Sequence, residues 1–178
     1  MSTTKWAAMA IAVIALGVTG CGTSDTGTGA AAASAPAAPR PKGTGPLPEK
    51  VVRADLDSSA ANAGVPNNAP DFARSAEERT DDSLMSCAVA FKGFGTKTTP
   101  VELTRFEKLV SELRERDWRP PRKNLKGADA VGETRVVLKQ RGWSMVASHM
   151  DIQKGVVTLL ATEDACVKRT GIDAGVLG

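Results

Sequence analysis

The chain has 178 residues, of which 42% are hydrophobic and 4% aromatic, and its formal net charge is +3. This length fits one modest domain, and the nearly balanced charge argues against bulk binding of nucleic acid. The single His excludes sites that need two imidazoles, such as HExxH or Cys2His2 zinc sites.

The first 20 residues have the pattern of a secretory signal peptide. Lys5 supplies positive charge, and an apolar run follows from Trp6 to Val18. This run of about 13 residues is shorter than the ~20 that a membrane-spanning helix needs. We therefore expect residues 1–20 to be removed, and a signal segment that stays in place as a membrane anchor is the less favoured alternative.

The residues that end the apolar run indicate the type of signal. Val18-Thr19-Gly20-Cys21 resembles the lipobox of bacterial lipoproteins, whose usual form is Leu-Ala/Ser-Gly/Ala-Cys. The resemblance implies cleavage before Cys21, a diacylglycerol thioether on Cys21 and a location at the extracytoplasmic face of the cell membrane. Val18 and Thr19 depart from the commonest residues, and an ordinary secreted protein with an incidental Cys21 is the alternative.

A segment dominated by Gly, Ala, Ser, Thr and Pro follows Cys21 and reaches Pro48. Such a segment has too few large apolar side chains to offset the entropy cost of ordering. Residues 21–48 are therefore expected to form a flexible tether. The lipobox, the tether and two further Cys together resemble small surface lipoproteins of actinobacteria, and this similarity implies a location rather than an activity.

Residues 49–178 are expected to form a single domain. A helix is predicted over 49–63, where Val52, Leu56, Ala60 and Ala63 make one apolar stripe. The segment 65–83 has the composition of an irregular connection with room for a short helix over 72–79. An apolar run over 84–91 then predicts a strand that ends before the glycines at 93 and 95.

The clearest local signal predicts another helix from Pro100. Thr99 and Glu102 have the spacing of a capping box, with Pro100 at the first helical position. Glu112 and Arg116 are expected to form an ion pair on the exposed face of this helix. Its core-facing stripe is expected to contain Leu103, Phe106, Leu109, Val110 and Leu113.

Three strands are predicted after this helix, over 134–140, 143–150 and 156–162, with Trp143, Met145 and Ala147 on one face. The expected fold class is therefore α+β. It is one small two-layer domain, a mostly antiparallel sheet of about four strands with a helix packed on it, preceded by a further helix.

Two cysteines remain when Cys21 is set aside. Cys87 and Cys166 are expected to form a disulfide, because paired cysteines are usual in exported domains. The bridge would hold the first and last strands side by side and close a loop of about 80 residues. A redox pair is the alternative, but the sequence contains no CxxC motif.

The most basic segment of the chain is 114–126, which carries six Lys or Arg and two acids. It is a candidate binding patch for anionic lipid headgroups, anionic envelope polymers or an acidic protein partner. The alternative is a solvated basic loop whose Trp118 covers the core and whose partner is the acidic stretch 53–82. The members of the candidate patch are Arg114, Arg116, Trp118, Arg119, Arg122, Lys123 and Lys126.

The preferred function is a non-catalytic binding or interaction module at the cell envelope. The alternatives are an envelope hydrolase or transferase that uses scattered residues such as His149 and Glu163, and a small lipid or ligand carrier. His149 is expected to be structural, because the sequence has no nucleophile motif such as GxSxG to accompany it. Metal-ligand spacing is also missing, so the sequence predicts no metal and no cofactor.

Overall fold

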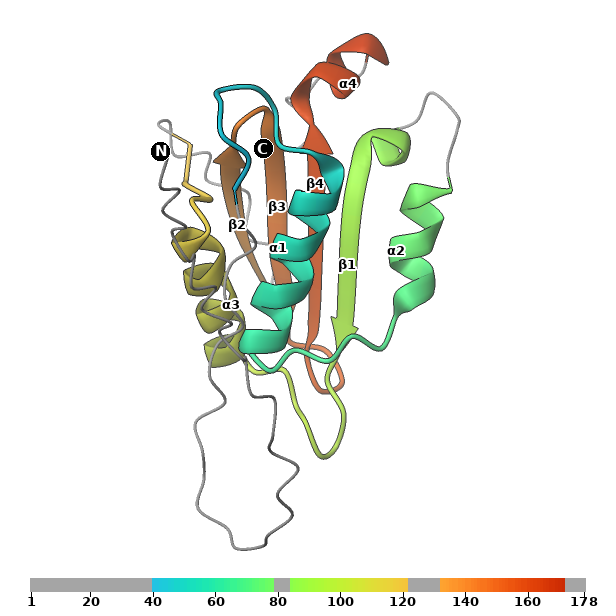
Figure 1. The fold of residues 1–178 in the computed structure, drawn as a ribbon. Coiled ribbons are helices and arrows are strands. Elements are labelled where there is room, and N and C mark those ends of the chain that lie inside the picture. The colour runs from blue at the N-terminus through green and yellow to red at the C-terminus, as the bar shows by residue number, and fades with distance from the viewer. Residues whose placement is uncertain (1–39, 79–83, 122–131, 172–178) are drawn as a thin grey trace, which may run out of the picture. The chain divides into compact units, whose positions relative to one another are not determined.

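The computed structural model describes residues 40–78, 84–121 and 132–171. In these ranges the chain forms an α+β domain built on one antiparallel sheet, which confirms the predicted fold class. The four strands are β1 (Ala88–Phe94), β2 (Glu133–Gln140), β3 (Trp143–Met150) and β4 (Val156–Glu163). Their spatial order is β1-β4-β3-β2, so β1 and β2 are the two edges (Figure 1).

Helices cover one face of the sheet and flank one of its edges. α1 (Glu49–Asn62) and α3 (Leu103–Glu115) contact each other, and in Figure 1 α1 lies in front of the strands with α3 to its left. α2 (Pro70–Glu77) lies beside the edge strand β1, and α4 (Asp164–Arg169) directly follows β4. The short helix expected over 72–79 is therefore present, shifted by two residues.

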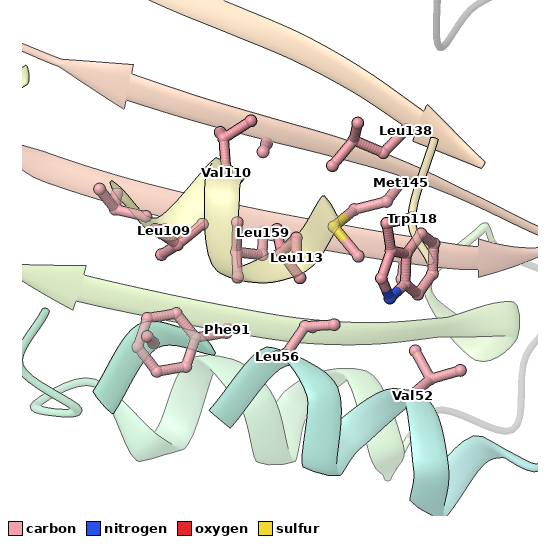
Figure 2. Close-up of a cluster of buried hydrophobic side chains, with 14 of the residues drawn as sticks. Val52, Leu56, Phe91, Leu109, Val110, Leu113, Trp118, Leu138, Met145 and Leu159 are labelled. Atoms are coloured by element: carbon pink, nitrogen blue, oxygen red, sulfur yellow. The ribbon is translucent and has the colours of Figure 1, made fainter. Parts of the chain in front are cut away.

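The core lies between α1, α3 and the inner face of the sheet (Figure 2). α1 contributes Val52 and Leu56, and α3 contributes Leu109 and Leu113, all four fully buried. Burial of each such side chain stabilises the fold by about 1.5–3 kcal/mol. The apolar stripe predicted for α1 is confirmed, since Ala60 and the residue after the helix, Ala63, are buried too.

The hairpin of β2 and β3 follows its predicted pattern. Along β3, buried and half-buried residues alternate, with Trp143, Met145 and Ala147 on the inner face. Arg141 and Gly142 join the strands with φ angles of 37° and 79°. Two positive φ values are the geometry of a two-residue type I′ turn, whose twist matches that of the strands.

The strand predicted over 84–91 is displaced in the structure. Leu84–Cys87 form a turn of 3-10 helix, and β1 runs from Ala88 through Gly93 to Phe94. Gly93 pairs with Val157 in the ladder instead of ending the strand. A side chain at Gly93 would collide with the backbone carbonyl of Pro66, so the glycine allows the connection between α1 and α2 to approach the strand.

The predicted capping box is wrong, because α3 begins at Leu103 and no side chain caps it. The amide of Val101 donates to the carbonyl of Lys154, and the Val101 carbonyl accepts from Nε2 of His149, both at 2.8 Å. These bonds hold the chain against the β3–β4 turn, so the helix cannot start at Pro100. Leu103 consequently misses the core and is 43% exposed.

The predicted pair of Glu112 and Arg116 forms, but on the buried side of α3. Arg116 Nη1 lies 3.1 Å from Glu112 Oε2, and the two side chains are 4% and 9% exposed. Asn62 of α1 donates to the same carboxylate oxygen at 2.8 Å. This pair therefore lies where α1 and α3 meet, and the expectation of an exposed pair is corrected.

Residues 40–48, here called the strap, pack against the β2–β3 hairpin. The amide of Leu47 donates to the Arg141 carbonyl, and the Leu47 carbonyl accepts from the indole of Trp143 at 2.9 Å. Arg141 donates in turn to the carbonyls of Pro41 and Gly45, each at 3.0 Å. The packed domain thus starts before residue 49, and part of the segment expected to be tether belongs to it.

Candidate functional site

The predicted disulfide between Cys87 and Cys166 is confirmed. It joins the 3-10 turn before β1 to α4 and spans 79 residues of sequence. Ala88 and Thr162 pair next to it, so the bridge closes one end of the β1–β4 ladder. Cys21, the predicted site of lipidation, lies outside the described residues.

Two members of the candidate basic patch are buried. Trp118 has no exposed surface and Arg116 is 4% exposed, so neither side chain is available to a partner. Arg114 and Arg119 are exposed. The remaining members, Arg122, Lys123 and Lys126, lie outside the described residues.

Trp118 belongs to a buried polar cluster centred on Asp55. The indole Nε1 donates to Asp55 Oδ2 at 3.0 Å, and Arg40 Nη1 lies 2.8 Å from the same oxygen. Arg40 also donates to the Arg116 carbonyl, which accepts a second bond from Nε2 of Gln140. The cluster connects the start of the strap, α1, the end of α3 and β2.

Burial raises the pKa of Asp55 above its ordinary value. The hydrogen bond from Trp118 and the charge of Arg40 act in the opposite direction, and the charge of Arg116 adds to them. Desolvation is the largest of these effects, because the carboxyl is 1% exposed. The geometry is therefore that of a structural anchor between α1 and its neighbours.

His149 and Glu163, named as candidates for an enzyme, are not brought together. His149 pairs with Val157 in the sheet, whereas Glu163 pairs with Trp143 at the other end of β4. Six residues of extended chain separate the two positions, which is about 20 Å. His149 is buried, bonds to the Val101 carbonyl and stacks near Phe106, as expected of a structural histidine.

The hollows on the described surface include two that lie against the sheet or α1. One of about 310 Å³ lies beside the disulfide and is lined by residues that include Leu47, Glu49, Trp143 and Glu163. The other, of about 240 Å³, lies between α1, α2 and β1. Both are at or below the lower limit of ordinary small-molecule sites, and neither contains His149.

Four of the exposed cations lie on the edge strand β2, on the segment paired with it and at the end of α3, while other exposed Lys and Arg lie elsewhere on the described surface. Arg119 and Lys139 exchange two backbone hydrogen bonds of 2.7 and 3.0 Å, so their side chains lie close together. Arg119 also bonds to Asp117, and Arg135 bonds to Glu133, both at the surface. We call this surface the basic edge, and it is made of Arg114, Arg119, Arg135 and Lys139.

The opposite edge of the sheet has a different charge. α2 flanks β1 and exposes Asp71 on its first turn and Glu78 at its end. Residues 70–78 and β1 together carry three acids and two Lys or Arg, whereas residues 114–119 and β2 carry five Lys or Arg and three acids. The two edges of the sheet therefore differ in net charge over the described residues, −1 on the β1 side and +2 on the β2 side.

Comparisons with protein-family models, curated proteins and solved structures find no match. Among the described residues, no group of three or more His, Cys, Asp or Glu is placed to hold a metal ion. Within the same ranges, no helix is long and apolar enough to cross a membrane.

Sequence reasoning missed Asp55 as a core residue and Arg135 and Lys139 as neighbours of the basic segment. A signal for Asp55 existed, since it follows Val52 by three residues and therefore lies on the apolar side of α1. Lys139 carried no such signal, because its pairing with Arg119 is a tertiary contact across 20 residues.

Proposed function

We propose that this chain is a lipid-anchored envelope protein that acts as a non-catalytic binding module. Its ligand is an anionic group of the envelope, and its binding surface is the basic edge. The observation that carries the proposal is the pairing of Arg119 with Lys139, which places two exposed cations beside each other at the edge of the sheet. Exposed cations of this kind attract phosphate and carboxylate groups.

Two further observations support this proposal. The disulfide is typical of proteins that fold outside the cytoplasm, in agreement with an exported lipoprotein anchored through Cys21. Burial of Trp118 removes the aromatic side chain from the binding surface, so the proposed recognition is electrostatic. Electrostatic recognition of this kind weakens as salt is added.

The ligand can be tested with a soluble poly(glycerol phosphate) and the mature chain, residues 21–178, carrying Cys21→Ser. The double variant Arg119→Ala/Lys139→Ala should bind the polymer at least about tenfold more weakly. A matched control, Arg74→Ala/Lys97→Ala, also removes two exposed cations, but away from the basic edge. Equal binding by both variants and the parent chain would contradict the proposed binding surface.

The anchor has its own test, the mass of the chain recovered from membranes of the producing cell. The recovered chain is expected to begin at Cys21 and to have the mass of a chain that carries a diacylglycerol group. The Cys21→Ala variant should yield no such acylated chain in the membrane fraction. A parent chain recovered without acyl groups would contradict the anchor.

A further inference from the structure

We infer that the basic edge docks on the anionic lipid headgroups of the membrane that carries the chain's own anchor. The inference rests on the proposed function, since it keeps the same surface and names the source of the anionic groups. Two observations carry it: the place where the strap begins and the opposite charges of the two sheet edges.

The strap begins on the same side of the domain as the basic edge. Arg40 donates to the Arg116 carbonyl, and its Nη1 lies 3.5 Å from Oε1 of Gln140. Gln140 follows Lys139 on β2, and Arg116 precedes Arg119 by three residues. In Figure 1 the strap, drawn in blue, crosses the β2–β3 end of the sheet before it enters α1. Arg40, the first described residue after the segment that leads to Cys21, therefore lies on the side of the domain that carries these cations.

The chain between the anchor and the strap is short. Eighteen residues, 22–39, separate Cys21 from Arg40. A random-coil chain of that length has a root-mean-square span of about 21–25 Å. Tethering over such a distance corresponds to an effective concentration of about millimolar. Even a weak attraction between the basic edge and the membrane surface is then sufficient to orient the domain.

Charge determines the direction of that orientation. Each Lys or Arg close to an anionic membrane raises the affinity about fivefold. Arg114 and Lys139 have no acidic partner within the described ranges, whereas Arg119 and Arg135 are each bonded to one acid. Asp71 and Glu78 on the other edge are repelled by the same surface. The basic edge therefore faces the membrane, and α2 faces away from it.

The first experiment measures partition of the mature chain with Cys21→Ser onto lipid vesicles by co-sedimentation. We expect binding to equimolar phosphatidylglycerol and phosphatidylcholine, no binding to phosphatidylcholine alone, and loss of binding as salt is raised. The variant Arg119→Ala/Lys139→Ala should bind the anionic vesicles about 25-fold more weakly. The control Arg74→Ala/Lys97→Ala should stay within about twofold of the parent, and thermal midpoints should show that both variants are folded.

A second experiment uses the lipidated chain inserted in vesicles and an amine-reactive reagent. Lys139 should be protected from modification on anionic vesicles and reactive on phosphatidylcholine vesicles, while Lys97 should react equally on both. Equal reactivity of Lys139 on the two kinds of vesicle overturns the proposed orientation.

The outcomes separate this inference from the function on which it rests. Binding to poly(glycerol phosphate) without binding to anionic vesicles overturns membrane docking and leaves the proposed function standing. Failure to bind either probe overturns both. Equal weakening by the two double variants shows that total charge, rather than the basic edge, governs the interaction, and this result also overturns the inference.

Discussion

The indole Nε1 of Trp118 donates a 3.0 Å hydrogen bond to Oδ2 of Asp55 across 63 residues of sequence. Both side chains are buried, at 0% and 1% exposure. Asp55 belongs to the most acidic stretch of the chain and Trp118 to the most basic. Asp55 from the acidic stretch and Arg116 from the basic segment are therefore buried inside the domain. Of the basic segment, Arg114 and Arg119 are exposed and belong to the basic edge.

Replacing Asp55 with Ala should destabilise the domain by about 2–4 kcal/mol. The change leaves the Trp118 N–H buried without its acceptor and removes the carboxylate that faces Arg40. Urea unfolding of the oxidised protein measures the loss. As a control, Asp71→Ala removes an exposed carboxylate from α2 and should change the free energy of unfolding by less than about 1 kcal/mol.

The pH dependence of stability should reveal the raised pKa of Asp55. A carboxyl with a higher pKa in the folded than in the unfolded chain binds more protons when folded. Its contribution to stability is then complete below the ordinary value of 3.8 and is lost as pH rises through the raised pKa. The free energy of unfolding of the parent, relative to Asp55→Asn, should therefore fall as pH increases from about 4.

Urea unfolding of the parent and Asp55→Asn at a series of pH values checks this sign. The opposite slope, with the parent gaining on the variant as pH rises, would mean that Arg40, Arg116 and the Trp118 hydrogen bond outweigh burial. The pKa of Asp55 would then be depressed in the folded protein, contrary to the expectation.

Local apolar periodicity predicted much of this fold. The stripe through Val52 and Leu56 placed α1 correctly, and the alternation of Trp143, Met145 and Ala147 gave the inner face of β3. Each pattern is encoded within one element, since a helix or strand must turn its apolar side towards the core. The disulfide was predictable for a different reason, because only two cysteines remained to pair once Cys21 was assigned to the lipobox.

Features set by contacts between distant segments were not predictable in this way. Thr99 has the local chemistry of a helix cap, but the hydrogen bonds of Val101 with Lys154 and His149 override it. The sequence likewise offers Trp118 as a residue that could contact a ligand, but its hydrogen bond to Asp55 holds the side chain in the core. Of the candidate patch, Arg114 and Arg119 are exposed and the aromatic residue Trp118 is buried. Lys139, from a strand distant in sequence, lies beside Arg119.

Reduction of the Cys87–Cys166 bridge should lower the thermal midpoint by about 10–20 °C. The bridge closes a loop of 79 residues, for which chain entropy predicts a stabilisation of about 4–5 kcal/mol. Calorimetry with and without a non-thiol reductant measures the shift. The double variant Cys87→Ser/Cys166→Ser should melt near the reduced parent and should not respond to reductant, and an unchanged midpoint in the parent would contradict a stabilising role.

Loss of the Arg141 side chain should release the strap while the rest of the domain stays folded. Arg141 donates to the carbonyls of Pro41 and Gly45, which flank the exposed Lys42. Removing two such bonds costs about 1–3 kcal/mol of local stability, so Arg141→Ala should raise the rate of tryptic cleavage after Lys42 about tenfold.

Mass spectrometry of the fragment that starts at Gly43 follows this cleavage. Arg135→Ala serves as the matched control, because it removes an exposed arginine near the other end of β2, and it should leave the rate unchanged. Cleavage that is equally fast in the parent would show that the strap is not held by Arg141. The start of the strap would then be held by the contacts of Arg40 with Asp55, the Arg116 carbonyl and Gln140.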